Sequence, residues 1–455
     1  MSLRSPARIL VLGSGGREHA LAWKLAGEPG VREVIVAPGS AGIASPGRVV
    51  VVPECDPLDG AGVVDLARAR NVDLVVIGPE APLAAGVADA LRAAGIATFG
   101  PGAEAARIES SKAYCHAVAE AAGVRMARAR AFADLDGALE FARGLAVRGG
   151  GVVVKADGLA AGKGVTVCDD MVPAEAALRA IFDEPGQTSG APRVVIEERL
   201  YGPEASLIAV CDGRDALALP AARDHKRLLD GDLGPNTGGM GAYSPVPDLP
   251  EATAAALVES IHRPILAELA RRGSPFIGAL YAGLILTEDG PVLLECNARF
   301  GDPETQVLLP RLGVALGPLL LAAAEGRLAA AAADMEITGV LLPVRPGATV
   351  GIVLAAEGYP DKPRAGDPIA GLRLVEQTGA LVFHAGTAEL QQGRFMTAGG
   401  RILTVVGEGA NLREARLNAE RAVNQVGFVG MQRRGDIAAL VTPAPTGIAI
   451  SGPAR

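Results

Sequence analysis

The sequence predicts a multidomain protein that combines α/β and α+β parts. Its 455 residues exceed what one hydrophobic core usually serves, so several domains are expected. The first hundred residues alternate short apolar runs with helical patterns, which is typical of parallel βαβ units. From Ala205 to Leu294, in contrast, apolar runs are joined by polar loops and turns, a pattern that favours antiparallel strands.

The N-terminal part should contain four buried parallel strands. The apolar runs that predict them are Ile9–Leu12, Val34–Ala37, Leu74–Ile77 and Ala97–Phe99. Glycine, proline or both follow each run, and helical patterns occur at His19–Leu25 and Leu83–Ala93. In such a sheet, ligand-binding loops lie at the carboxyl ends of the strands.

The rest of the chain divides into further elements and domains. The expected elements are a helix at Lys112–Ala122, strands at Val152–Lys155, Val165–Val167 and Val194–Glu197, a hairpin turn at Thr287–Gly290 and an alanine-rich connecting helix at Leu321–Ala333. The expected domains are residues 1–105, a central domain of 106–124 and 196–327, a small domain of 125–195 inserted into it, a last domain of 328–440, and a tail of 441–455.

Composition excludes several function classes. Aromatic residues make up 3% of the chain and the net charge is −8 without a long basic run, so nucleic acid and membrane surfaces are not expected partners. The five cysteines are scattered and never form a Cys-x-x-Cys motif, which favours a reduced, cytoplasmic protein without a zinc site. The apolar stretch Leu312–Ala324 is too short to span a bilayer and should form a buried helix.

A glycine-rich loop follows the first strand and precedes a helix. Backbone amides at such a helix start attract phosphate, and the residues concerned are Gly13, Ser14, Gly15, Gly16, Arg17 and Glu18. A dinucleotide-binding loop is the alternative, but Glu18 stands where its third glycine belongs and Pro38 follows the second strand where an acidic residue is expected. A second candidate loop, Gly78-Pro79-Glu80, ends the third strand at the same edge.

A second glycine-rich loop carries two lysines. Its residues are Lys155, Gly158, Gly162, Lys163 and Gly164, which suit close approach to phosphates. It is not a Walker A loop, because Gly164 occupies the position of the magnesium-binding Ser or Thr. Downstream, the strand-end acids Glu197, Glu198 and Glu204 could accept ribose hydroxyls or form a solvated strand end.

Three polar side chains interrupt an otherwise apolar strand. Glu295 and Asn297 share one face because strand side chains alternate, and their oxygens suit a hard cation that also binds phosphates. Arg299 has the same parity if the strand continues that far, and it could neutralise a transferring phosphoryl group or a carboxylate. Asp302, followed by Pro303, is expected to be a helix N-cap.

A long loop from Asp224 to Tyr243 combines opposite charges with a tip of small residues. Asp224 and Lys226 supply charge, and His225 is expected to orient the loop. The tip should close its backbone around a substrate through Asn236, Thr237, Gly238, Gly239, Met240 and Gly241.

Together these blocks resemble the glycinamide ribonucleotide synthetase (phosphoribosylamine–glycine ligase) family. The most specific are Asp-His-Lys-Arg with Gly-Pro-Asn-Thr-Gly-Gly-Met-Gly, and Asn-Ala-Arg-Phe-Gly-Asp-Pro-Glu-Thr-Gln. The resemblance implies an ATP-grasp fold with an N-terminal Rossmann-like, phosphoribosylamine-binding domain, a small ATP-grasp lid at 125–195 and a C-terminal mixed α/β domain. It implies ATP-dependent joining of glycine to 5-phosphoribosylamine through glycyl phosphate, in purine biosynthesis, by a monomer.

The resemblance also implies roles for the marked residues. Glu295 and Asn297 would hold Mg²⁺ or Mn²⁺, and Arg299, Asp224 and Lys226 would be catalytic. ATP would contact Lys112, Lys155, Gly162, Lys163, Gly164, Glu197, Glu198 and Glu204. Glycine and phosphoribosylamine would be bound by the segments 13–18 and 236–241, together with Gly78, Pro79 and Glu80. Three alternatives are another ATP-grasp enzyme using formate or bicarbonate, a nicotinamide-dependent oxidoreductase, and a non-catalytic nucleotide-binding regulator.

Overall fold

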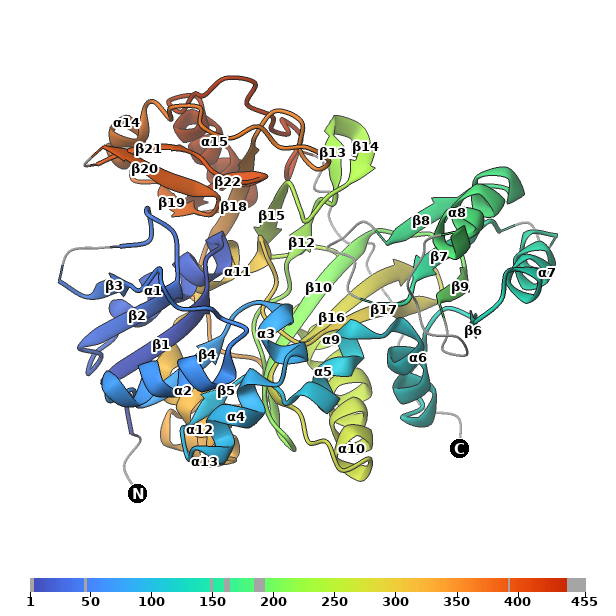
Figure 1. The fold of residues 1–455 in the computed structure, drawn as a ribbon, viewed down its shortest axis with the longest axis horizontal. Coiled ribbons are helices and arrows are strands. Elements are labelled where there is room, and N and C mark those ends of the chain that lie inside the picture. The colour runs from blue at the N-terminus through green and yellow to red at the C-terminus, as the bar shows by residue number, and fades with distance from the viewer. Residues whose placement is uncertain are drawn as a thin grey trace.

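The computed structural model describes residues 4–44, 47–147, 150–158, 164–183, 193–391 and 393–439. An N-terminal lobe, a central sheet and a C-terminal lobe lie against one another, and a small sheet with two helices projects from them (Figure 1). No helix within these ranges is both long enough and apolar enough to cross a membrane.

The N-terminal lobe is built on a parallel sheet of strand order β3-β2-β1-β4-β5. Its strands are β1 (Arg8–Gly13), β2 (Glu33–Pro38), β3 (Val49–Val51), β4 (Leu74–Ile77) and β5 (Thr98–Phe99). Its helices are α1 (Gly16–Ala26), α2 (Gly60–Ala69), α3 (Glu80–Ala84), α4 (Val87–Ala93) and α5 (Ala103–Ser110). The four predicted strands are confirmed. The single helix predicted at Leu83–Ala93 is wrong, because Gly86 adopts φ +80° and separates α3 from α4.

The central sheet is antiparallel, with strand order β11-β10-β16-β17. Its strands are β10 (Glu204–Asp212), β11 (Ala216–Ala218), β16 (Ile277–Thr287) and β17 (Gly290–Asn297), and the predicted turn at Thr287–Gly290 is confirmed. Helices α6 (Lys112–Ala121), α9 (Glu251–Leu257) and α10 (Arg263–Arg271), with a π-helical turn at Val258–His262, accompany it. One apolar cluster contains Leu10 of β1 and Leu207 of β10, so the N-terminal lobe and this sheet share a core.

The projecting sheet, here called the lid, has the antiparallel order β6-β9-β7-β8. Its strands are β6 (Ala129–Phe132), β7 (Val152–Ala156), β8 (Val165–Cys168) and β9 (Val194–Glu198), and its helices are α7 (Leu135–Ala146) and α8 (Met171–Asp183). The lid has an apolar core of its own, which includes Val154 and Ile196. It can therefore hold its shape while projecting from the body (Figure 1).

The C-terminal lobe contains a sheet of order β12-β15-β18-β22-β19. Its strands are β12 (Arg223–Asp224), β15 (Gly241–Ser244), β18 (Ala348–Ala355), β19 (Leu381–His384) and β22 (Arg401–Gly409). The lobe also holds α14 (Leu372–Glu376), α15 (Leu412–Val423) and a hairpin of β20 (Thr387–Gln391) and β21 (Arg394–Thr397).

Two predicted segments differ from the structure. The long loop predicted at Asp224–Tyr243 is largely wrong, because β12 and β15 join the C-terminal sheet and a hairpin of β13 (Arg227–Leu229) and β14 (Leu233–Asn236), with a 3₁₀ turn at Asp230–Asp232, lies between them. The helix predicted at Leu321–Ala333 is two helices, α12 (Leu316–Ala324) and α13 (Leu328–Asp334), because Gly326 adopts φ +68°. The buried helix predicted near Leu312–Ala324 is confirmed by α12. A short α11 (Glu304–Leu308) and a 3₁₀ turn at Leu309–Arg311 precede it.

Candidate active site

A buried lysine of the site joins the lid to the central sheet. Lys155 on β7 places its Nζ 2.8 Å from Oε1 of Glu197 on β9, and the same Nζ donates to the carbonyl oxygen of Leu294 at 3.2 Å. His116 Nε2 lies 2.8 Å from that Glu197 oxygen. Burial would raise the pKa of Glu197, but the Lys155 ammonium and His116 outweigh it and hold the pKa below its usual range. Lys155 therefore remains close to the strand that carries Glu295.

A second lysine reaches the glycine-rich loop from the first residue of α6. Lys112 Nζ donates to the carbonyl oxygen of Gly158 at 2.5 Å, and burial lowers the pKa of Lys112. Asp157 fixes the start of α6, because its carboxylate accepts from Ser111 Oγ at 3.1 Å and from the Ala113 amide at 3.2 Å. The structure thus brings Lys112 and Lys155 to the same side of the lid.

The tip of the glycine-rich loop, with the predicted residues Gly162 and Lys163, lies outside the described residues. At its base, the Gly164 carbonyl accepts the Ala156 amide at 2.7 Å. Glu198, the last residue of β9, accepts the backbone amide of Arg128 at 2.8 Å, a contact at the edge of the lid sheet.

Lys226 lies between acidic side chains of three strands. Its Nζ is 3.0 Å from Glu204 Oε2 of β10 and 3.6 Å from Glu295 Oε1 of β17. Burial would lower the pKa of Lys226, yet Glu204, Asp224 and Glu295 raise it well above its ordinary value. The pKa of Asp224 is raised to about 7, chiefly by burial and also by the charges of Glu304, Glu204 and Glu295, although Lys226 acts to lower it. The cluster therefore offers one ammonium and one carboxyl group whose proton is loosely held near neutral pH.

Glu295 and Asn297 end strand β17, as the sequence predicts. Lys226 holds the pKa of Glu295 below its usual range, so this carboxylate is charged at neutral pH. Its side chain is 37% exposed and accessible to a ligand. Within the described part of the chain, no three His, Cys, Asp or Glu side chains converge to hold a metal. A carboxylate and an amide oxygen fit a divalent cation whose other ligands are phosphate oxygens and water.

Arg299 turns towards the N-terminal lobe. Its Nη2 is 3.1 Å from Glu109 Oε1 and its Nε is 3.4 Å from Glu80 Oε2, so two carboxylates fix the guanidinium. Glu109 also accepts the Ala298 amide at 2.7 Å. Burial would raise the pKa of Glu80, but Arg299 and Arg17 outweigh it and lower it. Glu80, at the start of α3, thus connects the second candidate loop to the strand-end arginine.

The buried side chain of Glu18 fixes the backbone of the first glycine-rich loop. Its carboxylate accepts the Gly15 amide at 2.7 Å and lies 2.5 Å from Arg17 Nε, and its side chain is buried. A Cβ at Gly78 would lie 2.1 Å from Glu18 Oε1, so the two candidate loops fit together only because residue 78 is glycine. Glu18, which stands where a dinucleotide-binding loop has its third glycine, therefore supports the loop. Ser14 of the same loop is exposed.

The small-residue segment is held at both ends. Thr237 Oγ1 donates to the Lys226 carbonyl at 2.8 Å, and the Met240 side chain is buried. Asn236 Nδ2 lies 3.5 Å from the Val165 carbonyl oxygen of the lid, which links the β13–β14 hairpin to β8. His225 supports the segment through its backbone, since its carbonyl accepts the Met240 amide at 2.8 Å.

The prediction that Asp302 caps a helix is wrong. Pro303 is the N-cap residue of α11, and the Asp302 carboxylate instead accepts Gln306 Nε2 at 2.7 Å and lies 2.9 Å from Arg401 Nη2. In the folded chain the Asp302 carboxylate bonds to these side chains instead of to the backbone amides at the start of the helix. Asp302 therefore connects the central domain to the C-terminal lobe.

Several residues of the site were not predicted. His116 could have been found, because it lies four residues after Lys112 and so shares its helix face. Glu109, Tyr359 and Arg401 carry no local signal, since only the tertiary fold brings them to the loops that they contact.

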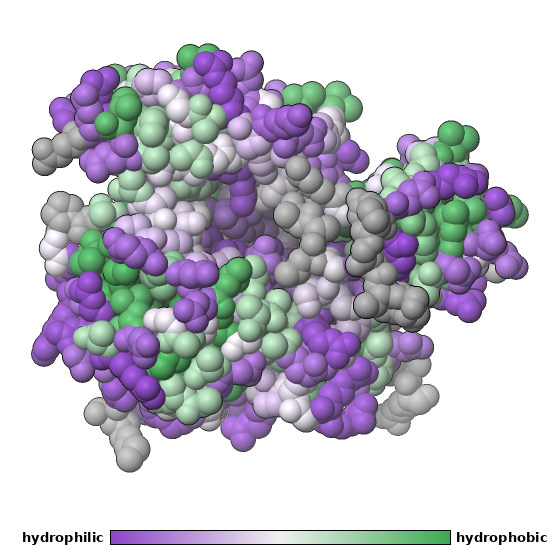
Figure 2. Space-filling model, in the orientation of Figure 1, coloured by the Kyte–Doolittle hydropathy of each residue, from purple (hydrophilic) through white to green (hydrophobic). Residues whose placement is uncertain are grey.

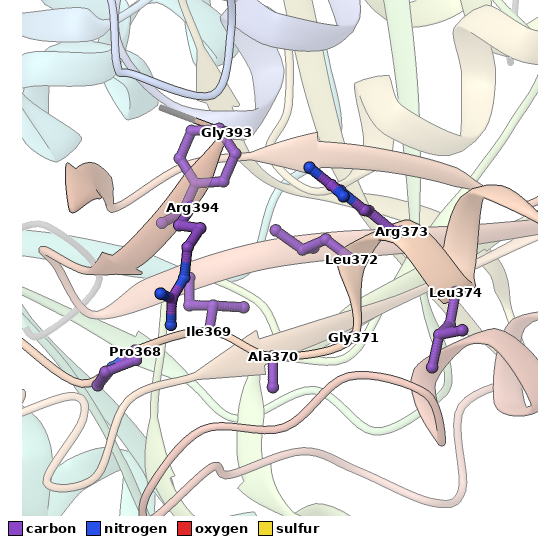
Figure 3. Close-up of a pocket in the computed structure, with 10 residues that line it drawn as sticks. Pro368, Ile369, Ala370, Gly371, Leu372, Arg373, Leu374, Gly393 and Arg394 are labelled. Carbon is purple, nitrogen blue, oxygen red and sulfur yellow. The ribbon is translucent and has the colours of Figure 1, made fainter. Parts of the chain in front are cut away.

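A hollow with a hydrophilic lining lies between the two lobes and the lid (Figure 2). One pocket of about 270 Å³ lies where β8 meets the β13–β14 hairpin, and Asn236 lines it. A larger pocket of about 350 Å³ lies elsewhere, between residues 368–374 and 393–395 of the C-terminal lobe (Figure 3). None of the predicted site residues lines this larger pocket.

Comparisons with known proteins match this chain to one family along most of its length. Three family profiles match in succession: the phosphoribosylglycinamide synthetase N domain at residues 7–109, its ATP-grasp (A) domain at 110–305 and its C domain at 349–440. The phosphoribosylamine–glycine ligase of Streptomyces coelicolor is 49% identical over 440 residues, which are 95% of this chain and 99% of that protein.

Solved structures agree as well. The crystal structure of phosphoribosylamine–glycine ligase from Thermotoga maritima matches with a TM-score of 0.76 and 34% identity, covering 94% of this chain and 100% of that one. The biotin carboxylase domain of the Hydrogenobacter thermophilus 2-oxoglutarate carboxylase matches with a TM-score of 0.68 at 16% identity, covering 94% and 92% of the two chains, and shares the fold alone. This chain belongs to the phosphoribosylglycinamide synthetase family and has its N, ATP-grasp and C domains in that order.

Proposed function

We propose that the protein joins glycine to 5-phosphoribosylamine with ATP, giving glycinamide ribonucleotide, ADP and phosphate, in purine biosynthesis. The observation that carries this proposal is the convergence of lid and sheet. Lys155 of the lid bonds to the Leu294 carbonyl, next to Glu295, and Lys226 connects Glu295 to Glu204. Phosphoryl transfer needs such positioned charge more than a covalent nucleophile.

The reaction has two displacements. A carboxylate oxygen of glycine attacks the γ-phosphorus of ATP, the bond to the β–γ bridging oxygen breaks, and ADP leaves. The amine of phosphoribosylamine then attacks the carboxyl carbon of glycyl phosphate, phosphate leaves, and the amine loses one proton. We assign that proton to Asp224, whose pKa of about 7 suits a group that accepts a proton near neutral pH.

The charged side chains divide these tasks. Lys112, Lys155 and Lys163 would neutralise ATP phosphates, with Gly162 and Gly164 letting the loop approach and exclude water from glycyl phosphate. Glu197, Glu198 and Glu204 would line the nucleoside end, and Lys226 would orient Asp224. Arg299, held by Glu80 and Glu109, would stabilise charge on the transferred phosphoryl group. Mg²⁺ or Mn²⁺, when bound by Glu295 and Asn297, would neutralise phosphate charge.

We assign the substrates to different domains. We assign phosphoribosylamine to the N-terminal domain, residues 1–105, through its loops at 13–18 and 78–80, with segment 236–241 facing them. ATP would bind between the lid, about 125–195, and the central domain of 106–124 and 196–327. The C-terminal domain, 328–440, would support the site, and the tail 441–455 lies outside the described residues. We infer a cytoplasmic monomer that acts on small molecules only.

Steady-state assays test the proposal against its alternatives. ADP and phosphate should form only when glycine and phosphoribosylamine are both present. Folded protein without glycine-dependent turnover would overturn the proposal, and turnover with formate or bicarbonate in place of glycine would favour another ATP-grasp enzyme. Tight, ATP-independent binding of NADH would favour an oxidoreductase, and ATP binding without turnover would favour a regulator.

A further inference from the structure

Two side chains of the C-terminal lobe hold the small-residue segment of the site. We propose that Arg401 and Tyr359 are positioning residues, which fix Gly238 and Gly239 for phosphoribosylamine and leave ATP binding to the lid. The inference rests on the proposed function and assigns to the C-terminal lobe a part in recognising one substrate.

Arg401, the first residue of β22, makes three contacts with its guanidinium. Nη1 donates to the carbonyl oxygens of Gly238 at 2.5 Å and of Asp302 at 2.8 Å, and Nη2 lies 2.9 Å from Asp302 Oδ2. A planar guanidinium can hold two backbone segments in one geometry, which a compact ammonium cannot do. Arg401 therefore sets the distance between the Gly238 segment and the Asp302 segment.

Tyr359 holds the other side of the same peptide. Its hydroxyl oxygen accepts the Gly238 amide at 2.9 Å, so Gly238 is bound through its N–H by Tyr359 and through its carbonyl by Arg401. Gly400 makes room for the ring, because a Cβ there would lie 2.4 Å from Tyr359 Cδ2. Gly239 follows with φ +111°, and a Cβ on it would lie 2.5 Å from Pro303. The segment is thus enclosed by the C-terminal lobe and residues 302–303.

The position of these contacts favours a role in binding phosphoribosylamine rather than ATP. A Cβ at Gly15 would lie 3.5 Å from Asp302 Oδ2, and a Cβ at Gly16 would lie 2.7 Å from Gln306 Nε2. Arg401 therefore reaches the first glycine-rich loop through one residue, Asp302. The predicted ATP lysines make other contacts, Lys112 with Gly158 and Lys155 with Glu197 and Leu294.

The strand that follows Gly238 joins this segment to the C-terminal sheet. The segment leads into β15, which pairs with β18 of the C-terminal sheet through Gly241 and Ile352. Arg401 and Tyr359 belong to the same lobe, one at the start of β22 and the other four residues after β18 ends at Ala355. The small-residue segment is therefore tied to the C-terminal lobe both by strand pairing and by these two side chains.

Steady-state kinetics of Arg401→Met and Tyr359→Phe test the inference, with phosphoribosylamine formed in situ from ribose 5-phosphate and ammonia. The KM for phosphoribosylamine should rise about tenfold in Arg401→Met, which loses charged hydrogen bonds, and about threefold in Tyr359→Phe. The KM for ATP should stay within about twofold of wild type, since lost contacts far from a ligand do not weaken it. Arg401→Lys should recover part of the loss, and the control Arg394→Met, on β21 beside the larger pocket, should leave all constants unchanged.

Gly238→Ala tests the same contact from the other side. The new Cβ would lie 3.1 Å from Arg401 Cζ and displace the guanidinium, while the backbone at this position is not left-handed. It should reproduce the effect of Arg401→Met, and the double variant should be no worse than the stronger single variant, because both break one contact.

The outcomes separate the inference from the proposed function. An unchanged KM for phosphoribosylamine in Arg401→Met, Tyr359→Phe and Gly238→Ala would overturn the inference while active wild-type protein upholds the function. Equal rises in the KM for ATP and phosphoribosylamine would also overturn it, because the contacts would then serve only the fold. If Arg401→Met does not fold, Tyr359→Phe and Gly238→Ala decide. Wild-type protein without glycine-dependent turnover would instead reject the proposed function itself.

Discussion

Lys155 Nζ lies 2.8 Å from Glu197 Oε1 while donating to the Leu294 carbonyl, so one buried ammonium connects two lid strands to the strand that ends in Glu295 and Asn297. His116 binds the same Glu197 oxygen from α6. The lid is therefore anchored to the central sheet by a buried charged group.

Lys155→Met should damage both stability and activity. It removes one partner of a buried ion pair and should lower the free energy of unfolding by about 3 kcal/mol, while His116 keeps one hydrogen bond to Glu197. kcat should fall by about 10²-fold, because the positive charge that would neutralise the transferred phosphoryl group is lost. Urea unfolding and initial rates measure the two effects. Wild-type kcat in folded variant protein would show that Lys155 only supports the lid.

Glu295→Gln should stop turnover without unfolding the protein. The side chain keeps its size but loses the charge that a divalent cation needs, so kcat should fall by more than about 10²-fold and Mn²⁺ binding should weaken. Electron paramagnetic resonance of added Mn²⁺ measures the binding separately from activity. Glu288→Gln, at the exposed turn of the same hairpin, is the matched control and should change neither. Normal rates of Glu295→Gln at saturating Mg²⁺ would refute the role of Glu295.

Arg299→Lys should lower kcat by at least about tenfold although the charge is kept. The guanidinium meets Glu109 and Glu80 at 3.1 and 3.4 Å from two different nitrogens, and a single ammonium cannot reproduce that fork. The measurement is kcat at saturating substrates, with thermal unfolding as the check on folding. An unchanged kcat would mean that Arg299 joins the lobes without acting on the phosphoryl group.

Acid should destabilise the contact between α1 and β19. Burial, and then the charge of His384, lower the pKa of His19 to about 3, and burial lowers that of His384 to about 4. The His384 amide donates to His19 Nδ1 at 2.9 Å, Phe383 packs edge-on against the His19 ring, and Trp23 packs against Phe383. In the unfolded chain both imidazoles bind protons below about pH 6.5, so the stabilisation is complete above that pH and is lost as the pH falls towards 4.

The variant His19→Asn isolates this effect because it keeps an acceptor for the His384 amide. Between pH 4 and 6, its free energy of unfolding should depend on pH less steeply than that of wild type, by up to about 1.4 kcal/mol per pH unit. Urea unfolding across that range measures the slope. Identical slopes for the two proteins would show that His19 is protonated in the folded state.

The sequence allowed much of the fold to be predicted where local pattern and burial coincide. The parallel strands from Ile9 to Phe99 and the hairpin at Thr287–Gly290 are confirmed because continuous apolar runs with turn residues have few alternative structures. The helices at 83–93 and 321–333 were predicted too long, since single glycines with positive φ interrupt them. Strand β15 was missed because its partner β18 lies far along the chain, beyond the reach of local pattern, and β12 pairs in turn with β15.

For the site, too, some residues could be predicted from the sequence and others could not. Glu295, Asn297 and Arg299 could be marked from the sequence, because polar groups at the end of a buried strand need a reason to be there. Asp302 was assigned to a cap because its true partner, Arg401, is 99 residues away. Glu109 and Tyr359 act through neighbours that only the tertiary fold supplies, whereas the helical spacing of His116 from Lys112 could have marked it.

Glycine labelled with ¹⁸O in its carboxylate provides the most direct measurement of the central claim. One carboxylate oxygen attacks the γ-phosphorus and leaves with phosphate when the amine forms the amide, so each glycinamide ribonucleotide should be accompanied by one phosphate that carries one ¹⁸O atom. Mass spectrometry of the released phosphate measures this transfer. Phosphate without the label, formed together with glycinamide ribonucleotide, would contradict a glycyl phosphate intermediate.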